Sequence, residues 1–182
     1  MKSEIYTKSG DDGFTSLASG KRIKKSSDII ELCGCLEALN VFLGHAAEFL
    51  YSRSEFTELL KQIYRIQKEL FEIIFRLLSE KKFVINPHGF SDLEVGINTM
   101  SERLPILHSP ILPGGGEAAS RIYLAWAVCR RAERAAFRLF ATNDSAEIVG
   151  IYLNRLSDWL YVAARTTALT VHAEEMTVVD VL

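Results

Sequence analysis

Three arginines lie close together in the run Cys129–Arg134. Arg130 and Arg134 are four positions apart, so on a helix they project from the same side, with Glu133 beside them. A guanidinium group donates parallel hydrogen bonds in one plane, which matches the oxygens of a carboxylate or a phosphate. The run therefore predicts an anion site. Spacing alone equally allows a solvated helix face whose arginines form local ion pairs.

Residues 5–20 form a second group that could bind a ligand, because this stretch is rich in glycine, hydroxyl side chains and lysine. Gly10 and Gly13 would let backbone amides approach a ligand, and the side-chain donors of this loop are Thr7, Lys8, Ser9 and Thr15. Positive charge continues in Lys21, Arg22, Lys24 and Lys25. Such a loop can cradle phosphates, although it lacks the GxxxxGK[ST] order of a P-loop. The alternative is a solvated N-terminal arm with two turns.

A third group is a polar stripe on the most apolar helical segment near the C-terminus. Its members recur at helical spacing: Asn154, Ser157, Asp158, Tyr161 and Arg165. Buried polar groups need partners, so a stripe on an otherwise buried helix indicates either a binding site or a structural hydrogen-bond network between helices.

The elements that must position these groups follow from apolar periodicity. It predicts five helices, at about residues 28–46, 53–78, 92–104, 117–141 and 146–165. Capping boxes are expected at Ser52 with Glu55 and at Ser91 with Glu94, with a linker over 80–89. Only the first few residues and 176–182 could be extended. The predicted fold is all-α, a five-helix bundle with an ordered N-terminal nucleotide-binding loop, in a single domain over 1–182.

Composition narrows the classes of function. The formal net charge of -2 argues against a broad nucleic-acid surface. Three cysteines without a CxxC pair are expected as reduced core thiols in a cytoplasmic protein. We expect no secretory signal and no apolar run of membrane-spanning length, hence no membrane partner. The four histidines are scattered, and no metal site held by protein ligands alone is expected.

Five ordered motifs then point to a known family. They are Tyr6–Thr15 followed by Lys25, Gly34–Asn40, Ile111–Gly115, Cys129–Arg134 and Tyr152–Asp158. Over nearly its full length the chain resembles the PduO-type ATP:cob(I)alamin adenosyltransferases. The resemblance implies a homotrimer of five-helix bundles, with ATP and Mg²⁺ bound between the N-terminal loop of one subunit and the arginine helix of its neighbour. Cobalamin would lie beside ATP, and its reduced cobalt would attack the 5′ carbon, releasing triphosphate and forming adenosylcobalamin.

The same resemblance assigns individual residues. Contacts to ATP or Mg²⁺ are expected from Thr7, Lys8, Ser9, Gly10, Asp11, Gly13, Thr15, Lys25, Arg130, Glu133, Arg134 and Asn154. Of these, Arg130 and Asn154 are the expected catalytic residues. A cobalamin-dependent enzyme or a reductase is a further expected partner. The leaving group is a polyanion, so fixed cations and amide donors suit it, and cobalt as nucleophile makes a side-chain base unnecessary.

Three positions depart from the family pattern. Glu37 stands where the family usually has aspartate, Trp126 where it has arginine, and Pro110 where it has an aromatic residue. The first two family residues form an ion pair near the cobalamin, so Glu37 should reach water, become protonated or find another cation such as Arg165. The alternative function is therefore a non-catalytic or impaired ATP-binding paralogue that acts as a sensor or partner. A purely structural bundle would not explain the retained loop.

Overall fold

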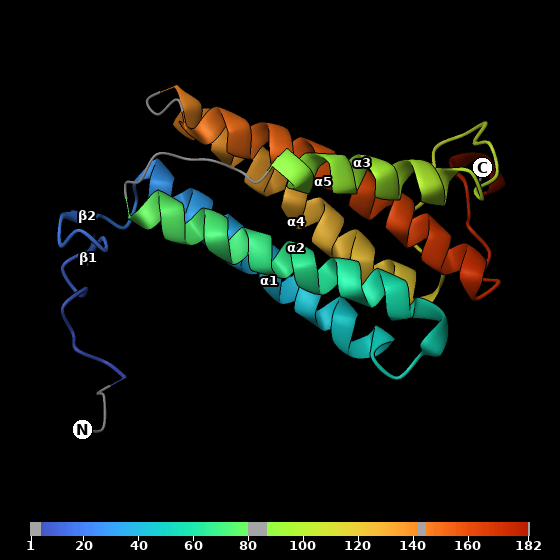
Figure 1. The fold of residues 1–182 in the computed structure, drawn as a ribbon, viewed down its shortest axis with the longest axis horizontal. Coiled ribbons are helices and arrows are strands. Elements are labelled where there is room, and N and C mark those ends of the chain that lie inside the picture. Colours follow the sequence, from blue (N-terminus) through green and yellow to red (C-terminus); the bar gives the residue numbers. More distant parts are fainter. Residues whose placement is uncertain (1–4, 80–86, 142–144, 182) are drawn as a thin grey trace.

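The computed structural model describes residues 5–79, 87–141 and 145–181. Five long helices dominate this part of the chain, which confirms the all-α prediction (Figure 1). In order, the elements are β1 (Phe14–Ser16), β2 (Arg22–Lys24), α1 (Asp28–Leu50), the 3₁₀ turn η1 (Ser54–Phe56), α2 (Thr57–Leu78), α3 (Pro87–Ser101), α4 (Gly116–Phe140), α5 (Ser145–Thr170) and the 3₁₀ turn η2 (Val178–Asp180).

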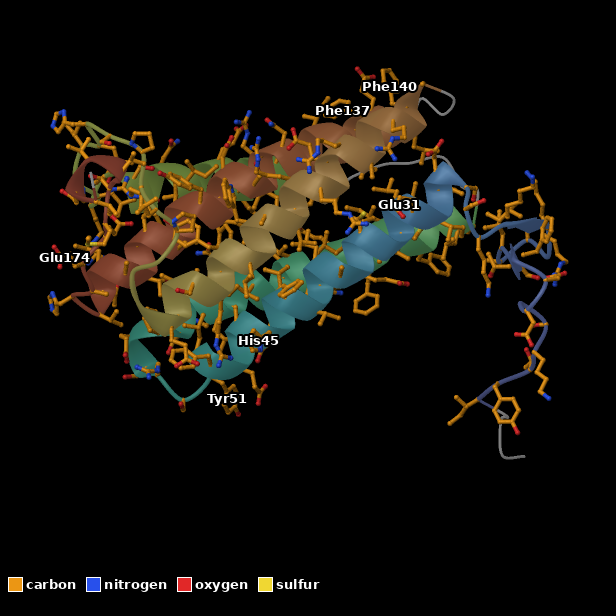
Figure 2. The ribbon with its side chains drawn as sticks, turned by 180° about the vertical axis from the view of Figure 1, so that it is seen from behind. Glu31, His45, Tyr51, Phe137, Phe140 and Glu174 are labelled. Atoms are coloured by element: carbon orange, nitrogen blue, oxygen red, sulfur yellow. The ribbon has the colours of Figure 1, made fainter. Side chains whose placement is uncertain are left out.

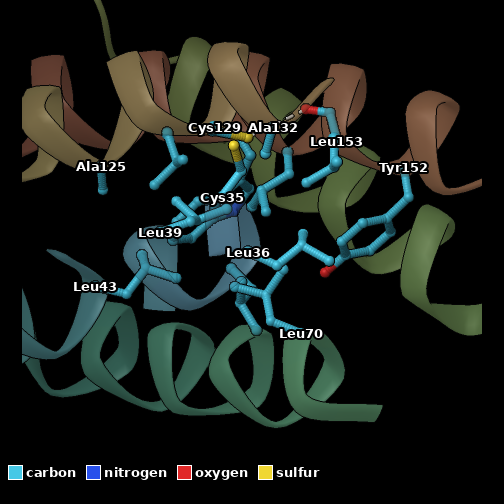
Figure 3. Close-up of a cluster of buried hydrophobic side chains, with 14 of the residues drawn as sticks. Cys35, Leu36, Leu39, Leu43, Leu70, Ala125, Cys129, Ala132, Tyr152 and Leu153 are labelled. Atoms are coloured by element: carbon cyan, nitrogen blue, oxygen red, sulfur yellow. Dashed lines mark hydrogen bonds between the residues drawn. The ribbon is translucent and has the colours of Figure 1, made fainter. Parts of the chain in front are cut away.

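The core lies where α4 packs between α1 and α5, with α2 added on the side of α1 and α3 on the side of α5. Leucines of α1 meet small residues of α4 such as Ala125 and Ala132, which allows close helix approach (Figure 3). The Cys129 thiol donates to the Leu153 carbonyl on α5 at 3.3 Å. Burial raises the pKa of Cys129, and all three cysteines are buried free thiols, as predicted.

Helix α1 corrects the expectation that no apolar run reaches membrane-spanning length. By length and composition it is long and apolar enough to cross a membrane, with a mean hydropathy of 1.4 over its most apolar window. Yet Leu32, Leu36, Leu39 and Leu43 are all buried in the protein core. Because α1 packs against both α2 and α4, its apolar character is that of an inner bundle helix.

Helix boundaries differ from the prediction by about four or five residues at the starts of α2 and α3 and at the ends of α1 and α5. The region of the second capping box is already helical, because α3 begins at Pro87; proline suits a first helical turn, where its missing N–H is not needed. The first predicted box is replaced by η1, and α2 begins only at Thr57, after Phe56. Ser27 does precede α1, but its hydroxyl makes no capping hydrogen bond. The remaining predicted linker, 80–86, falls outside the described residues.

Two short strands were not predicted. β1 and β2 pair antiparallel with Thr15 opposite Ile23, and the turn between them contains Gly20 at a φ of 84°. Leu17 is buried, and the Ala18 amide donates to the Leu78 carbonyl at 3.2 Å, which attaches the hairpin to the end of α2. Near the C-terminus, Thr177 forms an isolated bridge, but Val178–Asp180 is a 3₁₀ turn, so the extended prediction for 176–182 is wrong there.

The two irregular regions lie at opposite ends of the bundle. Figure 1 shows the N-terminal segment with β1 and β2 reaching beyond one end, whereas the loop after α3 and the C-terminal segment meet at the other end. Helix α4 runs between these ends, and its arginine run lies in the half of the helix that leads to Phe140 (Figure 2).

Candidate active site

The N-terminal loop is built from two consecutive turns. The Asp11 amide donates to the Lys8 carbonyl and the Gly13 amide to the Gly10 carbonyl, each at 3.2 Å. Lys8 has a φ of 58°, a left-handed conformation that non-glycine residues seldom adopt and that often marks a functional segment. The hydroxyls of Thr7 and Ser9 lie 2.8 Å apart. These two local turns fit both the predicted nucleotide-binding loop and the alternative of a solvated N-terminal arm with two turns.

An internal ion pair braces the loop. The Arg22 guanidinium donates to both carboxylate oxygens of Asp12, at 2.8 and 2.6 Å, and to the Ser9 carbonyl at 3.0 Å. The Phe14 amide also donates to Asp12. This backbone hydrogen bond, together with the positive charge of Arg22, holds the pKa of Asp12 below its usual value. Sequence reasoning treated Arg22 only as added positive charge and did not find this brace.

Lys25 is the cation that closes over the loop. Its backbone amide donates to the Gly13 carbonyl at 2.9 Å, directly after β2. A Cβ atom built on Gly10 would lie 2.8 Å from Lys25 Nζ, so a larger residue there would displace the lysine side chain from its place against the loop. Lys8 and Lys25 are both exposed. The loop thus presents two lysines and a glycine backbone to solvent, a donor set that suits phosphate oxygens.

The arginines of α4 divide into two roles. Arg131 donates to Glu31 of α1 at 2.9 Å, and this hydrogen bond lowers the pKa of Glu31, which lies near the start of α1 (Figure 2). This is the local ion pair of the solvated-face alternative. Arg130 instead stacks over the Trp126 ring, 5.7 Å from its centroid, and remains exposed. Within the described part of the chain, neither Arg130 nor Arg134 forms an ion pair.

Asn154 connects the polar stripe of α5 to the arginine helix. Its Nδ2 atom donates to Glu133 Oε1 at 3.0 Å, so two groups flagged separately in the sequence lie together in the fold. Glu133 is half-buried and Asn154 is exposed. The side chains of Arg130, Glu133 and Asn154 therefore form one polar surface that spans α4 and α5.

The stripe itself is not uniformly buried, which corrects the expectation of a buried polar row. Asn154 and Asp158 are exposed, whereas Ser157 and Arg165 are buried. Ser157 donates to the Asn154 carbonyl at 2.8 Å, a local bond within the helix. The exposed half is available to a ligand, and the buried half is structural.

In the described part of the chain, no hydrogen bond or ion pair joins the phosphate-type loop to Arg130, Glu133 or Asn154. Figures 1 and 2 show the N-terminal segment reaching beyond the end of the bundle at which α1 begins. Of the sequence-predicted site residues, the structure brings together Thr7 to Lys25 in one group and Arg130 to Asn154 in another.

Comparison with known proteins identifies the family and the fold of this chain. The sequence pattern of the cobalamin adenosyltransferase family matches residues 5–167. The chain belongs to this family. A corrinoid adenosyltransferase of Bacillus subtilis is 37% identical over 165 residues, which are 89% of this chain and 85% of that protein. Corrinoid adenosyltransferase MMAB of Homo sapiens is 33% identical over 173 residues, 91% of this chain and 69% of that protein.

Solved structures of cobalamin adenosyltransferases have the same architecture. A variant PduO-type ATP:corrinoid adenosyltransferase from Lactobacillus reuteri, complexed with cobalamin and ATP, superposes with a TM-score of 0.85. It is 27% identical in sequence, and the match covers 96% of this chain and 98% of that one. A second variant of that enzyme, complexed with ATP, is similar at a TM-score of 0.85 and 28% identity.

The three residues that depart from the adenosyltransferase pattern lie in separate places. Glu37 is exposed in the groove between α1 and α2, so it reaches water, the first of the expected outcomes. Arg165 is not its partner, because Arg165 pairs with Glu175. Trp126 is half-buried against the rings of Tyr123 and Tyr161, each about 6.1 Å away between centroids. Pro110 is exposed in the loop at the far end of the bundle.

Proposed function

We propose that this chain transfers the 5′-deoxyadenosyl group of ATP to cob(I)alamin. The cobalt–carbon bond forms as the bond between the 5′ carbon and its phosphate oxygen breaks, and triphosphate leaves with the electron pair. The observation that carries the proposal is the α4–α5 surface, where exposed Arg130 is adjacent to the Glu133–Asn154 hydrogen bond. An anaerobic assay of cob(I)alamin with ATP and Mg²⁺ tests it, and absence of adenosylcobalamin would refute it.

In this proposal the protein contributes binding and electrostatics. Arg130 and Arg134 would hold the triphosphate, because charge accumulates on its oxygens as it leaves. Lys8, Lys25 and the amides around Gly10 would hold the same group from the loop side. Asn154 would orient the nucleotide, and Glu133 would fix the Asn154 amide in the rotamer seen here. Glu133 would also offer a carboxylate oxygen to the Mg²⁺ that accompanies ATP.

We further propose that the enzyme is a homotrimer. Support comes from the lysine loop, which reaches beyond the end of its own bundle (Figure 1). In a trimer, the lysine loop of one subunit would lie beside the arginine surface of its neighbour. A groove of about 480 Å³ between α1 and α2 adds support, because exposed Val41 and Phe71 line it and would gain cover from a neighbour. Light scattering that shows a monomer at saturating ATP would contradict this assembly. A cytoplasmic location fits the three reduced thiols.

The second candidate function is an impaired ATP-binding paralogue. Trp126 favours it, because an indole packed beneath Arg130 replaces a charge by an apolar ring at the edge of the α4–α5 surface. The test is the triple reversion Trp126→Arg, Glu37→Asp and Pro110→Phe, compared with the parent by spectroscopic assay. Faster adenosylation in the revertant supports impairment. Equal rates mean that the three substitutions are neutral, and the paralogue hypothesis is then dropped.

A further inference from the structure

The end of the bundle opposite the lysine loop contains a buried ion pair that joins three segments. Arg165, on α5, lies with its Nε atom 3.3 Å from Glu175 Oε2, and the two side chains are 7% and 17% exposed. Its Nη2 atom donates to the Pro105 carbonyl at 3.2 Å. One guanidinium therefore holds both the loop that follows α3 and the C-terminal segment against the last turns of α5.

The chain reversal after α5 is what brings Glu175 back to Arg165. His172 adopts a φ of 54°, and the Ala173 amide donates to the Ala168 carbonyl at 2.9 Å, the left-handed ending of a helix. Gly115 completes the fit from the loop side. A Cβ there would lie 2.7 Å from Ala168 Cβ, so only glycine allows the loop to lie this close to α5.

The C-terminal segment in turn forms a short ladder with the loop. The Leu112 amide donates to the Met176 carbonyl at 2.8 Å, and the Val178 amide to the Pro110 carbonyl at 2.9 Å, on either side of the bridge between Ile111 and Thr177. The backbone of Pro110 is thus fixed by a segment that is itself held by Arg165 through Glu175. An isolated two-bond ladder is weak, so its position depends on such an anchor.

The cleft between these segments suits an apolar ligand edge better than a phosphate. It measures about 300 Å³, and Leu107, Ile111 and Leu169 contribute to its lining. Its cation, Arg165, is already neutralised by Glu175, whereas a polyphosphate requires unpaired positive charge. The lysine loop of the same chain lies at the opposite end (Figure 1).

We propose that Arg165 is a positioning residue for corrinoid binding, acting through Glu175 and the Pro105 carbonyl on the loop from 105 to 112. The inference rests on the proposed function and deepens it. The affinity for corrinoid should depend on the contacts of Arg165 with Glu175 and the Pro105 carbonyl, and the affinity for ATP should not. Arg165 acts by fixing the backbone that carries Pro110, without touching either substrate.

The experiment measures equilibrium binding, so it does not require turnover. Full-length parent and Arg165→Gln are titrated anaerobically with cob(II)alamin in the presence of ATP, and separately with ATP alone. We expect the corrinoid Kd to rise roughly tenfold, which corresponds to about 1.4 kcal/mol of binding free energy. The Kd for ATP should stay within about twofold of the parent value, a change of less than about 0.5 kcal/mol. Hydrogen exchange should speed up at the Leu112 and Val178 amides and stay unchanged along α1.

Control variants separate positioning from general stability. Arg65→Gln also removes an ion pair between elements, the one between α2 and Asp92 of α3, so it should destabilise the fold without changing either Kd. Arg165→Lys keeps the charge and should recover part of the corrinoid affinity. If Arg165→Gln fails to fold, Glu175→Gln breaks the same pair while keeping the side-chain shape, and the same shift is expected.

Three results would overturn the inference. The first is an equal loss of affinity for corrinoid and for ATP in Arg165→Gln. The second is a similar loss of corrinoid affinity in Arg65→Gln. The third is faster hydrogen exchange at the Leu112 and Val178 amides of Arg165→Gln without any change in the corrinoid Kd. A parent that binds cob(II)alamin and ATP yet forms no adenosylcobalamin refutes the proposed function alone. A parent that binds ATP but no corrinoid refutes both.

Discussion

Replacing Arg130 with Ala removes one of the two exposed α4 arginines that form no ion pair within the described residues. Arg130 is exposed, and its contact within the described part of the protein is the stacking on Trp126. Loss of that contact costs about 0.5–1 kcal/mol, typical of exposed cation–π pairs, so the variant should stay folded. Loss of hydrogen bonds to a charged group should cost about 1.5–3 kcal/mol of ATP binding. This corresponds to a roughly 10- to 150-fold weaker Kd.

The neighbouring arginine provides a matched control. Arg131 points toward α1, where it is occupied by Glu31. Arg131→Ala therefore changes the net charge of the helix by the same amount but should leave ATP affinity within about twofold of the parent. Arg130→Lys should fall between the parent and Arg130→Ala, because a lysine keeps the charge but cannot donate two parallel hydrogen bonds.

The assay is isothermal titration calorimetry with Mg²⁺ and ATP on parent and variants, with thermal unfolding measured alongside. Unchanged affinity in Arg130→Ala would place this residue outside the nucleotide site. Equal losses in Arg130→Ala and Arg131→Ala would show that only the general positive field of α4 matters. Either result would refute the division of roles drawn from the structure.

Two further predictions concern the loop and the core. The hydrogen bonds that Asp12 accepts lower its pKa in the folded loop. The ionised Asp12 carboxylate therefore stabilises the fold above pH ~4, the usual aspartate pKa, and this stabilisation is lost as the pH falls through the lowered pKa. An NMR titration that finds Asp12 titrating at or above the usual value would contradict this. Gly96→Ala places a Cβ 2.7 Å from the buried Trp159 Nε1 and should lower the free energy of unfolding by roughly 1–3 kcal/mol. Gly34→Ala meets nothing within 4 Å and should raise it by up to about 1 kcal/mol in the same denaturant measurement.

Much of the architecture could be predicted because helices are local. Apolar residues at steps of three and four define α1, α2, α4 and α5. Each predicted end lies within about five residues of the observed one. The same period places Arg130 and Arg134 on one side of α4, whatever surrounds it. The predicted start of α3 was wrong, since Ser91 fits a cap but Pro87 fits a first turn equally well, and local rules do not choose between them.

What the sequence by itself determined is therefore the helical content and the grouping of residues on each element. Only the tertiary structure decided which groups meet: Asn154 with Glu133, Arg22 with Asp12, and Arg165 with Glu175. The first of these pairs spans 21 positions and two helices, so it depends on how α4 and α5 are rotated about their axes. That rotation is set by the burial of apolar surface from the whole core at once, and no single segment of the chain contains that information.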